Sequence, residues 1–251
     1  MTAAWFTPLA SRPQANLRVV CLPYAGGSAA PFRRWLGLAP PWLELWTANL
    51  PGRERRIAEP APTSIAATVA AAADALVDTV PTPYVLCGHS MGAFIAYELA
   101  HELVHRAEPE PACLVVSGAR APHLEDNRPP IHGLPDEGFL AALRELEGTP
   151  AVLFEHTELL ELVAPTLRAD FTAVETYRHR FRPALTAPIV AYAGADDTVV
   201  RARDVAPWAE HTRGPCVVRT LAGGHFFPQD NPETFVGQLA ADLNDTVLSS
   251  V

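Results

Sequence analysis

The chain has 251 residues, of which 49% are hydrophobic, so it can bury the core of one α/β domain, which we expect to span residues 1–251. Its formal net charge of −9 argues against a nucleic-acid partner. We expect no signal peptide, because residues 1–16 have no basic region followed by a long apolar run. We expect no membrane span, because no stretch approaches roughly 20 apolar residues. The four cysteines lie in apolar runs, which is typical of buried, reduced thiols in a cytoplasmic protein.

The first buried strand is predicted at 17–22, where the chain is apolar and β-branched. A loop with two glycines, Pro23-Tyr24-Ala25-Gly26-Gly27-Ser28, follows directly. One interpretation is a tight turn in which Ser28 caps a helix over 31–38. The other is a loop whose glycines let a backbone NH approach a reacting group.

A second strand is predicted at 43–50, and it leads into Pro51-Gly52-Arg53-Glu54-Arg55-Arg56. The charge cluster alone favours a solvated turn. The alternative is an arginine surface that meets an acidic partner. Further along, an alanine-rich helix is predicted over 65–80, with Thr63 or Ser64 as its N-cap.

The central motif is Gly88-His89-Ser90-Met91-Gly92, which lies between a predicted buried strand at 84–87 and an amphipathic helix. This is the G-x-S-x-G pattern, in which a sharp strand-to-helix turn exposes the serine hydroxyl at the end of the strand. The free NH groups at the start of the helix favour an anion forming nearby. The alternative is a simple turn with a capping serine.

The same helix contains His101-Glu102-Leu103-Val104-His105, which matches the H-E-x-x-H pattern of zinc proteases. We expect no metal here. At 1.5 Å per residue, His105 lies roughly 22 Å along the helix from Ser90. The segment is interpreted as a solvated C-terminal turn, where histidine suits the helix dipole.

A further strand is predicted at 112–117, so strands and helices alternate as in a parallel sheet with helices on both faces. The alternation stops over 121–183, where we predict helices at 136–146, 155–163 and 166–180 and no strand. Such an insertion between sheet strands suits a lid over the strand ends. The alternative is an ordinary helical excursion without a gating role.

Two more strands are predicted at 189–193 and 216–221, before a closing helix over 232–247. The first ends in Gly194-Ala195-Asp196-Asp197-Thr198 and the second in Gly223-Gly224-His225. Serine, aspartate and histidine therefore follow one another in the order of the α/β-hydrolases. Asp196 and Asp197 both compete for the acid position, and the G-x-x-D spacing favours Asp197. Both can also be simple turn formers.

These residues suit acyl transfer. His225 would remove the proton of Ser90, and the aspartate would orient the imidazole and stabilise its protonated form. The backbone NH groups of Met91 and Ala25 would bind the oxyanion, as in an α/β-hydrolase. The acyl group would pass first to serine and then to water.

With these residues in place, the chain resembles the type II thioesterases of polyketide and nonribosomal peptide biosynthesis, which are kin to the stand-alone thioesterase of fatty acid synthase. The resemblance spans nearly the whole chain and is carried by Trp5-Phe6, 22–29, 50–56, 88–93, Arg120-Ala121-Pro122, 167–171 with Glu175 and Tyr177, and 223–227. One departure is Thr198, which stands where the family pattern has a proline after the aspartate.

The resemblance implies an α/β-hydrolase fold and an editing enzyme that hydrolyses acyl groups from the phosphopantetheine arm of a carrier protein. It implies Ser90, Asp197 and His225 as the triad, Ala25 and Met91 at the oxyanion hole, and a mobile helical lid over the acyl chamber. We expect a monomer, because no long exposed apolar heptad pattern suggests assembly. We expect no cofactor of its own, because the carrier protein holds the phosphopantetheine. Three alternatives are a small-ester carboxylesterase, a chain-releasing acyltransferase, and a binding module on an inactive hydrolase fold.

Overall fold

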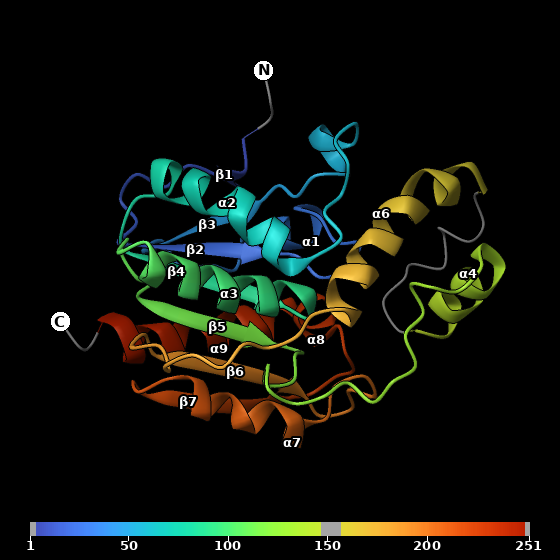
Figure 1. Cartoon of the computed structure of the whole chain (residues 1–251). Helices are drawn as coiled ribbons and strands as arrows, with labels where there is room; N and C mark the ends of the chain where they lie inside the picture. Colours follow the sequence, from blue (N-terminus) through green and yellow to red (C-terminus); the bar gives the residue numbers. More distant parts are fainter. Residues whose placement is uncertain (1–3, 147–156, 249–251) are drawn as a thin grey trace.

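A twisted sheet forms the centre of the computed structural model, which describes residues 4–146 and 157–248 (Figure 1). In these residues the sheet has seven strands in the order β1-β3-β2-β4-β5-β6-β7. All neighbouring pairs are parallel except β1 with β3. The strands are β1 (Phe6–Pro8), β2 (Leu17–Leu22), β3 (Leu43–Ala48), β4 (Tyr84–His89), β5 (Cys113–Ser117), β6 (Ile189–Gly194) and β7 (Cys216–Leu221).

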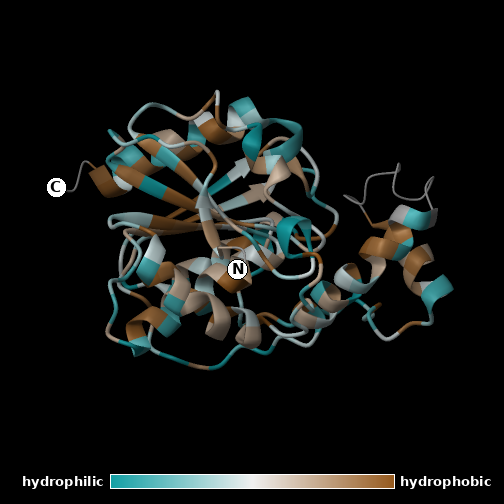
Figure 2. Ribbon diagram, turned by 90° about the horizontal axis from the view of Figure 1, so that it is seen from above, coloured by the Kyte–Doolittle hydropathy of each residue, from teal (hydrophilic) through white to brown (hydrophobic). Residues whose placement is uncertain are grey.

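Both faces of the sheet are buried, which explains why its central strands are almost continuously apolar. Along β2, Val20 packs on one face and Cys21 on the other. One face is covered by α2 (Ile65–Thr79), α3 (Met91–His105), α7 (Ala202–Val205) and the 3₁₀ helix η2 (Ala206–His211); the other by α1 (Ala30–Arg33), α8 (Phe227–Asp230) and α9 (Pro232–Leu243). Figure 2 shows the largely hydrophobic strands between these two helix layers.

The strand order places the loop after β2 next to the turn after β4. From β2 the chain crosses to β3 on one side, and from β3 it returns to β4 on the other side of β2. The order therefore reverses between β2 and β4, which is where open α/β sheets bind ligands beyond the carboxyl ends of their strands. Leu22 pairs with Gly88, so the loop after β2 and the turn after β4 leave the sheet side by side.

Most predicted elements are present with small shifts at their ends. Ser64 caps α2, since its hydroxyl accepts a hydrogen bond from the Ala67 NH at 3.2 Å. The prediction of a helix over 31–38 is wrong beyond Arg33, because the chain continues in tight turns that carry Trp35 into the core. β1 was not predicted. The short helices α7, α8, η1 (Glu54–Arg56) and η2 were also not predicted, and a π-helical turn, η3 (Asn244–Leu248), follows α9.

The insertion between β5 and β6 contains α4 (Asp136–Glu145) and α6 (Thr157–Glu175), which stand beyond the carboxyl ends of the strands (Figures 1 and 2). We predicted two helices at 155–163 and 166–180, but α6 runs unbroken through Pro165 and ends at Glu175. Phe139 and Leu143 of α4 form one apolar cluster with Val163 and Leu167 of α6, which lie before and after the proline. The start of the predicted 155–163 helix lies outside the described residues.

Among the helices of 4–146 and 157–248, none combines the length and apolar character that crossing a bilayer requires.

Candidate active site

Ser90 occupies a strained turn between β4 and α3. Its φ is 53°, a left-handed value that costs free energy for a residue with a side chain. The backbone around it is too tight for any side chain on the strand side, because a Cβ on Gly88 would lie 2.1 Å from the Gly92 carbonyl oxygen. The Ser90 NH donates to the Ser117 carbonyl at 2.8 Å, which fixes the turn to the end of β5.

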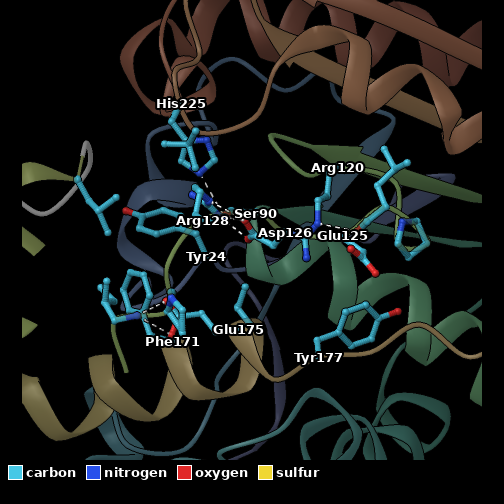
Figure 3. Close-up of a pocket in the computed structure, with 18 of the residues that line it drawn as sticks. Tyr24, Ser90, Arg120, Glu125, Asp126, Arg128, Phe171, Glu175, Tyr177 and His225 are labelled. Carbon is cyan, nitrogen blue, oxygen red and sulfur yellow. Dashed lines mark hydrogen bonds and ion pairs between the residues drawn. The ribbon is translucent and has the colours of Figure 1, made fainter. Parts of the chain in front are cut away.

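Three side chains from three strand ends form one hydrogen-bonded chain. His225 Nε2 lies 3.1 Å from Ser90 Oγ, and His225 Nδ1 lies 2.9 Å from Asp197 Oδ2. His225 follows β7, is 4% exposed, and points toward Ser90 across the sheet edge (Figure 3). With Asp197 ionised, Nδ1 carries the proton and Nε2 is free to accept one from the serine hydroxyl.

The structure places Asp197, and not Asp196, against the histidine. Asp197 is 7% exposed, and its second oxygen accepts hydrogen bonds from the Val199 and Val200 NH groups, both at 2.8 Å. Burial alone raises the pKa of Asp197, but the hydrogen bond and charge of His225 and the two backbone NH groups lower it overall. The carboxylate is therefore held ionised in one orientation. Asp196 is exposed.

His89 fills the space beneath the histidine without adding charge there. Its ring centroid lies 5.1 Å from that of His225, and its Nδ1 lies 2.8 Å from Ser117 Oγ. Burial, and then the neighbouring charge of His225, hold the pKa of His89 well below its usual value. Gly118 leaves room for both rings, since a Cβ there would lie 2.5 Å from His89 Cε1 and 3.3 Å from His225 Cε1.

The backbone NH groups of Met91 and Ala25 are the predicted oxyanion donors. Met91 is the first residue of α3, so its NH has no acceptor within the helix. Ala25 lies in the loop after β2, the strand next to β4, and lines the same cavity as Ser90. Met91 therefore follows Ser90 directly, and Ala25 lies at the cavity that opens onto Ser90.

A cavity of about 640 Å³ opens onto Ser90 and His225. The insertion supplies much of its wall, including Val174 of α6. Figure 3 shows Phe171 of the same helix in this wall. A second part of the wall is charged. Asp126 bonds to Arg128 at 2.7 and 3.0 Å and to Arg120 at 3.2 Å. The cavity is therefore lined both by apolar side chains and by paired charges.

The sequence did not predict a role for this charged wall. Burial raises the pKa of Asp126, but its hydrogen bonds and charge pairing with Arg128, together with the charge of Arg120, lower it to about 2. In the sequence, Arg120 stood out only as part of Arg120-Ala121-Pro122, one of the segments that carry the family resemblance. The one available signal was the position of Gly118-Ala119-Arg120 directly after a buried strand, on the same edge as Ser90.

The arginine cluster of the second strand loop is not a solvated surface. Arg53 is 9% exposed and pairs with Asp170 of α6, while Arg56 is 5% exposed and pairs with Glu59. Only Arg55 of the three is exposed. Both interpretations of this cluster, a solvated turn and a docking surface, are therefore wrong for Arg53 and Arg56. Both guanidinium groups are buried, and each is paired with a carboxylate, Asp170 or Glu59.

The H-E-x-x-H segment does not converge on one point. His101 is buried with its ring against Tyr97, at 4.6 Å between centroids, while His105 is exposed. Glu102 pairs with Arg106. The prediction of a solvated turn is wrong for His101, whose pKa burial lowers to about 3, with nearby Arg182 and other histidines adding to the shift. Within the described residues, no group of three histidine, cysteine or acidic side chains is arranged to hold a metal ion.

The mostly parallel sheet and the serine, histidine and aspartate at its carboxyl edge define a member of the α/β-hydrolase class. A family model, the thioesterase domain, matches residues 17–243. The chain therefore belongs to the thioesterase domain family and is an enzyme that hydrolyses thioesters. This confirms the resemblance seen in the sequence.

Known proteins of this kind match the chain along almost its whole length. It is 39% identical over 247 residues to thioesterase PikA5 of Streptomyces venezuelae, covering 97% of this chain and 85% of that protein. It also matches the solved structure of YbtT, a type II thioesterase from the yersiniabactin NRPS/PKS pathway, with a TM-score of 0.87, 32% identity, and coverage of 97% and 100%. The thioesterase RedJ of the prodiginine pathway in Streptomyces coelicolor gives a TM-score of 0.86, 35% identity, and coverage of 94% and 95%.

Proposed function

We propose that this enzyme removes acyl groups from the phosphopantetheine arm of a carrier protein in polyketide or nonribosomal peptide biosynthesis, using Ser90, His225 and Asp197. The observation that carries the proposal is the chain of hydrogen bonds, 3.1 Å from Ser90 Oγ to His225 Nε2 and 2.9 Å from His225 Nδ1 to Asp197. Relatives named for NRPS/PKS pathways support the substrate class.

In the first step Ser90 Oγ attacks the thioester carbonyl carbon while His225 Nε2 takes the hydroxyl proton. The carbonyl electron pair moves to the oxygen, which the NH groups of Met91 and Ala25 stabilise. The electrons then return, the carbon–sulfur bond breaks, and His225 gives its proton to the departing thiolate. Asp197 keeps the imidazole oriented and stabilises its positive charge throughout.

In the second step water attacks the acyl-serine, and His225 takes a proton from that water. Collapse of this intermediate breaks the bond to Ser90 Oγ, returns the proton to the serine and releases a carboxylic acid. The proposal includes no cofactor or metal held by the enzyme, because Ser90 supplies the nucleophile and His225 acts first as the base and then as the acid. It also describes a monomer in the cytoplasm whose partner is the carrier protein.

The helices of the insertion would act as the lid of the acyl chamber. Phe171 and Val174 of α6 and Ile131 of the preceding loop line the cavity that opens onto Ser90, which supports this assignment. An acyl chain attached to Ser90 would extend along them. The lid of this proposal spans 121–183, of which 147–156 lie outside the described residues.

The proposal is tested with matched substrates: an acyl group on a carrier protein, the same group on free pantetheine, and its p-nitrophenyl ester. We expect the highest kcat/KM on the carrier-bound thioester, with the free acid as the product by mass spectrometry. A higher kcat/KM on the oxygen ester would favour a carboxylesterase, and an ester or amide product would favour an acyltransferase. Ser90→Ala should lower turnover at least about 10³-fold while the fold is retained, and full turnover in that variant would overturn the mechanism.

A further inference from the structure

The middle of α6 is bonded to the loops that follow β2 and β3. Asp170, 3% exposed, accepts hydrogen bonds from Arg53 Nη2 at 2.8 Å and from Arg53 Nη1 at 2.9 Å. One of its oxygens also accepts from the Gly26 NH at 2.7 Å. Arg53 in turn donates to the Gly27 carbonyl at 3.0 Å. A single carboxylate thus joins a helix of the insertion to the loop beside Ser90.

The turn at Gly26, in the loop after β2, is also held by close packing. Gly26 has a φ of +74°, and a Cβ there would lie 2.3 Å from Leu167 Cδ2 of α6. Leu167 and Asp170 are three residues apart and share one face of the helix. Thr166 directly precedes Leu167, and its hydroxyl donates a hydrogen bond to the Gly52 carbonyl at 2.7 Å. This stretch of α6 is therefore seated on both loops, and the Gly26 turn cannot shift without disturbing it.

We propose that Asp170 is a positioning residue, which, held by Arg53, fixes the Tyr24–Gly27 loop so that the Ala25 NH is aimed at the oxyanion. The inference rests on the proposed function, which places Ala25 at the oxyanion hole. Hydrogen bonds to an ionised acceptor are short and strong, so the carboxylate restrains the Gly26 NH more firmly than a neutral group would. A donor fixed beforehand stabilises the developing charge without reorganising during the reaction.

α6 therefore performs two tasks at once. Phe171, the next residue after Asp170, lines the cavity that opens onto Ser90 (Figure 3). Asp170 itself is buried away from the substrate against Arg53 and Gly26. Because it contacts the loop and not the substrate, its loss should lower the rate of the chemical step and leave substrate binding nearly unchanged.

The chain offers a matched control in Asp242 of α9. Asp242 is also 3% exposed, and it bonds to Arg219 at 2.8 Å and to the Tyr192 hydroxyl at 2.7 Å, but it does not line the cavity. Asp170→Asn and Asp242→Asn each neutralise one buried, paired carboxylate. Both should lower the melting temperature, because each leaves a buried donor, Arg53 or the Tyr192 hydroxyl, without its ionised acceptor.

The experiment measures kcat and KM on an acyl-pantetheine thioester, together with the melting temperature. For Asp170→Asn we expect kcat to fall about 10-fold or more and KM to change less than about 3-fold. For Asp242→Asn we expect unchanged kcat. A loss of melting temperature in both variants with kcat unchanged in Asp170→Asn would show a purely structural ion pair and overturn the proposal.

A trifluoromethyl ketone provides a second readout. Ser90 Oγ adds to its carbonyl carbon, the proton passes to His225, and the electron pair moves to the oxygen, so the adduct carries the oxyanion. Its affinity should fall in Asp170→Asn by the factor lost in kcat/KM, and unchanged affinity would overturn the proposal. If Asp170→Asn does not fold, Arg53→Lys takes its place, since it keeps the charge but loses the two-pronged contact; unchanged kcat there overturns the proposal too. Full turnover in Ser90→Ala would instead identify the proposed function as the part that failed.

Discussion

Gly92 and Leu22 approach one another so closely that a Cβ on Gly92 would lie 2.1 Å from the Leu22 carbonyl oxygen. Gly92 is the second residue of α3, and Leu22 is the last residue of β2. The helix that begins after Ser90 therefore rests directly on the strand that leads to the Ala25 loop. This contact sets the distance between the nucleophile and the loop across from it.

We expect Gly92→Ala to abolish turnover and to lower the free energy of unfolding, because the methyl group must displace backbone atoms, which cannot rotate away. Gly37→Ala is the control, since a Cβ at Gly37 would have no heavy atom within 4 Å. Urea unfolding and kcat/KM of the two variants provide the check. Wild-type stability in Gly92→Ala would contradict the close approach.

The two neighbouring aspartates at the end of β6 should differ sharply in their effect on catalysis. Asp197→Asn would favour the wrong tautomer of His225, and we expect kcat to fall about 10³- to 10⁴-fold. Asp196→Asn changes an exposed side chain, and we expect kcat to stay within about 2-fold of wild type. Steady-state kinetics of both variants decide the matter, and a large loss in Asp196→Asn alone would reverse the assignment.

The free energy of unfolding should depend on pH, because Asp126 in the charged part of the cavity wall has a lowered pKa. The pKa of Asp126 is about 2 in the folded protein, against an ordinary value of 3.8. A lowered pKa stabilises the folded state above pH 3.8, and this stabilisation is lost as the pH falls through 2. Asp126→Asn should therefore cost about 2 kcal/mol of unfolding free energy at pH 7, and less at pH 3.

The control for this prediction is Asp136→Asn, which also breaks an aspartate–arginine pair. Asp136 bonds to Arg168, but its side chain is 94% exposed, so the pair contributes little. Urea unfolding of both variants at pH 7, 4 and 3 gives the comparison. An equal cost of Asp126→Asn at all three pH values would show that its charge is not what stabilises the wall.

The sequence was sufficient to predict the central sheet and the residues at its edge. Buried parallel strands are apolar along their whole length, so β2 to β6 stand out from their surroundings. The carboxyl ends of parallel strands meet at one edge of the sheet. Ser90 and His225 could therefore be assigned to one site, although they lie 135 residues apart in the chain. The same motifs, taken together, also predicted the thioesterase family, which the family model confirms.

What the sequence could not predict depends on contacts between distant segments. Nothing local distinguishes Arg53 from Arg55, since the burial of Arg53 requires Asp170, which lies 117 residues further on. The same holds for Pro165, which normally ends a helix; here Val163 and Leu167, before and after it, share an apolar cluster with α4. The G-x-x-D spacing favoured Asp197 over Asp196, but the sequence left both open, because the choice depends on the direction in which the turn after β6 points each side chain.

The insertion branches from the connection between β5 and β6, whereas Ser90, Asp197 and His225 follow β4, β6 and β7. Exchanging this segment with that of a related enzyme would alter the acyl chamber and leave the strands that carry the reacting side chains in place. The graft has a chemical requirement at Arg53, which needs a carboxylate opposite it. A chimera that brings alanine or leucine to this position would bury an uncompensated guanidinium, and a donor segment that already carries aspartate there meets the requirement.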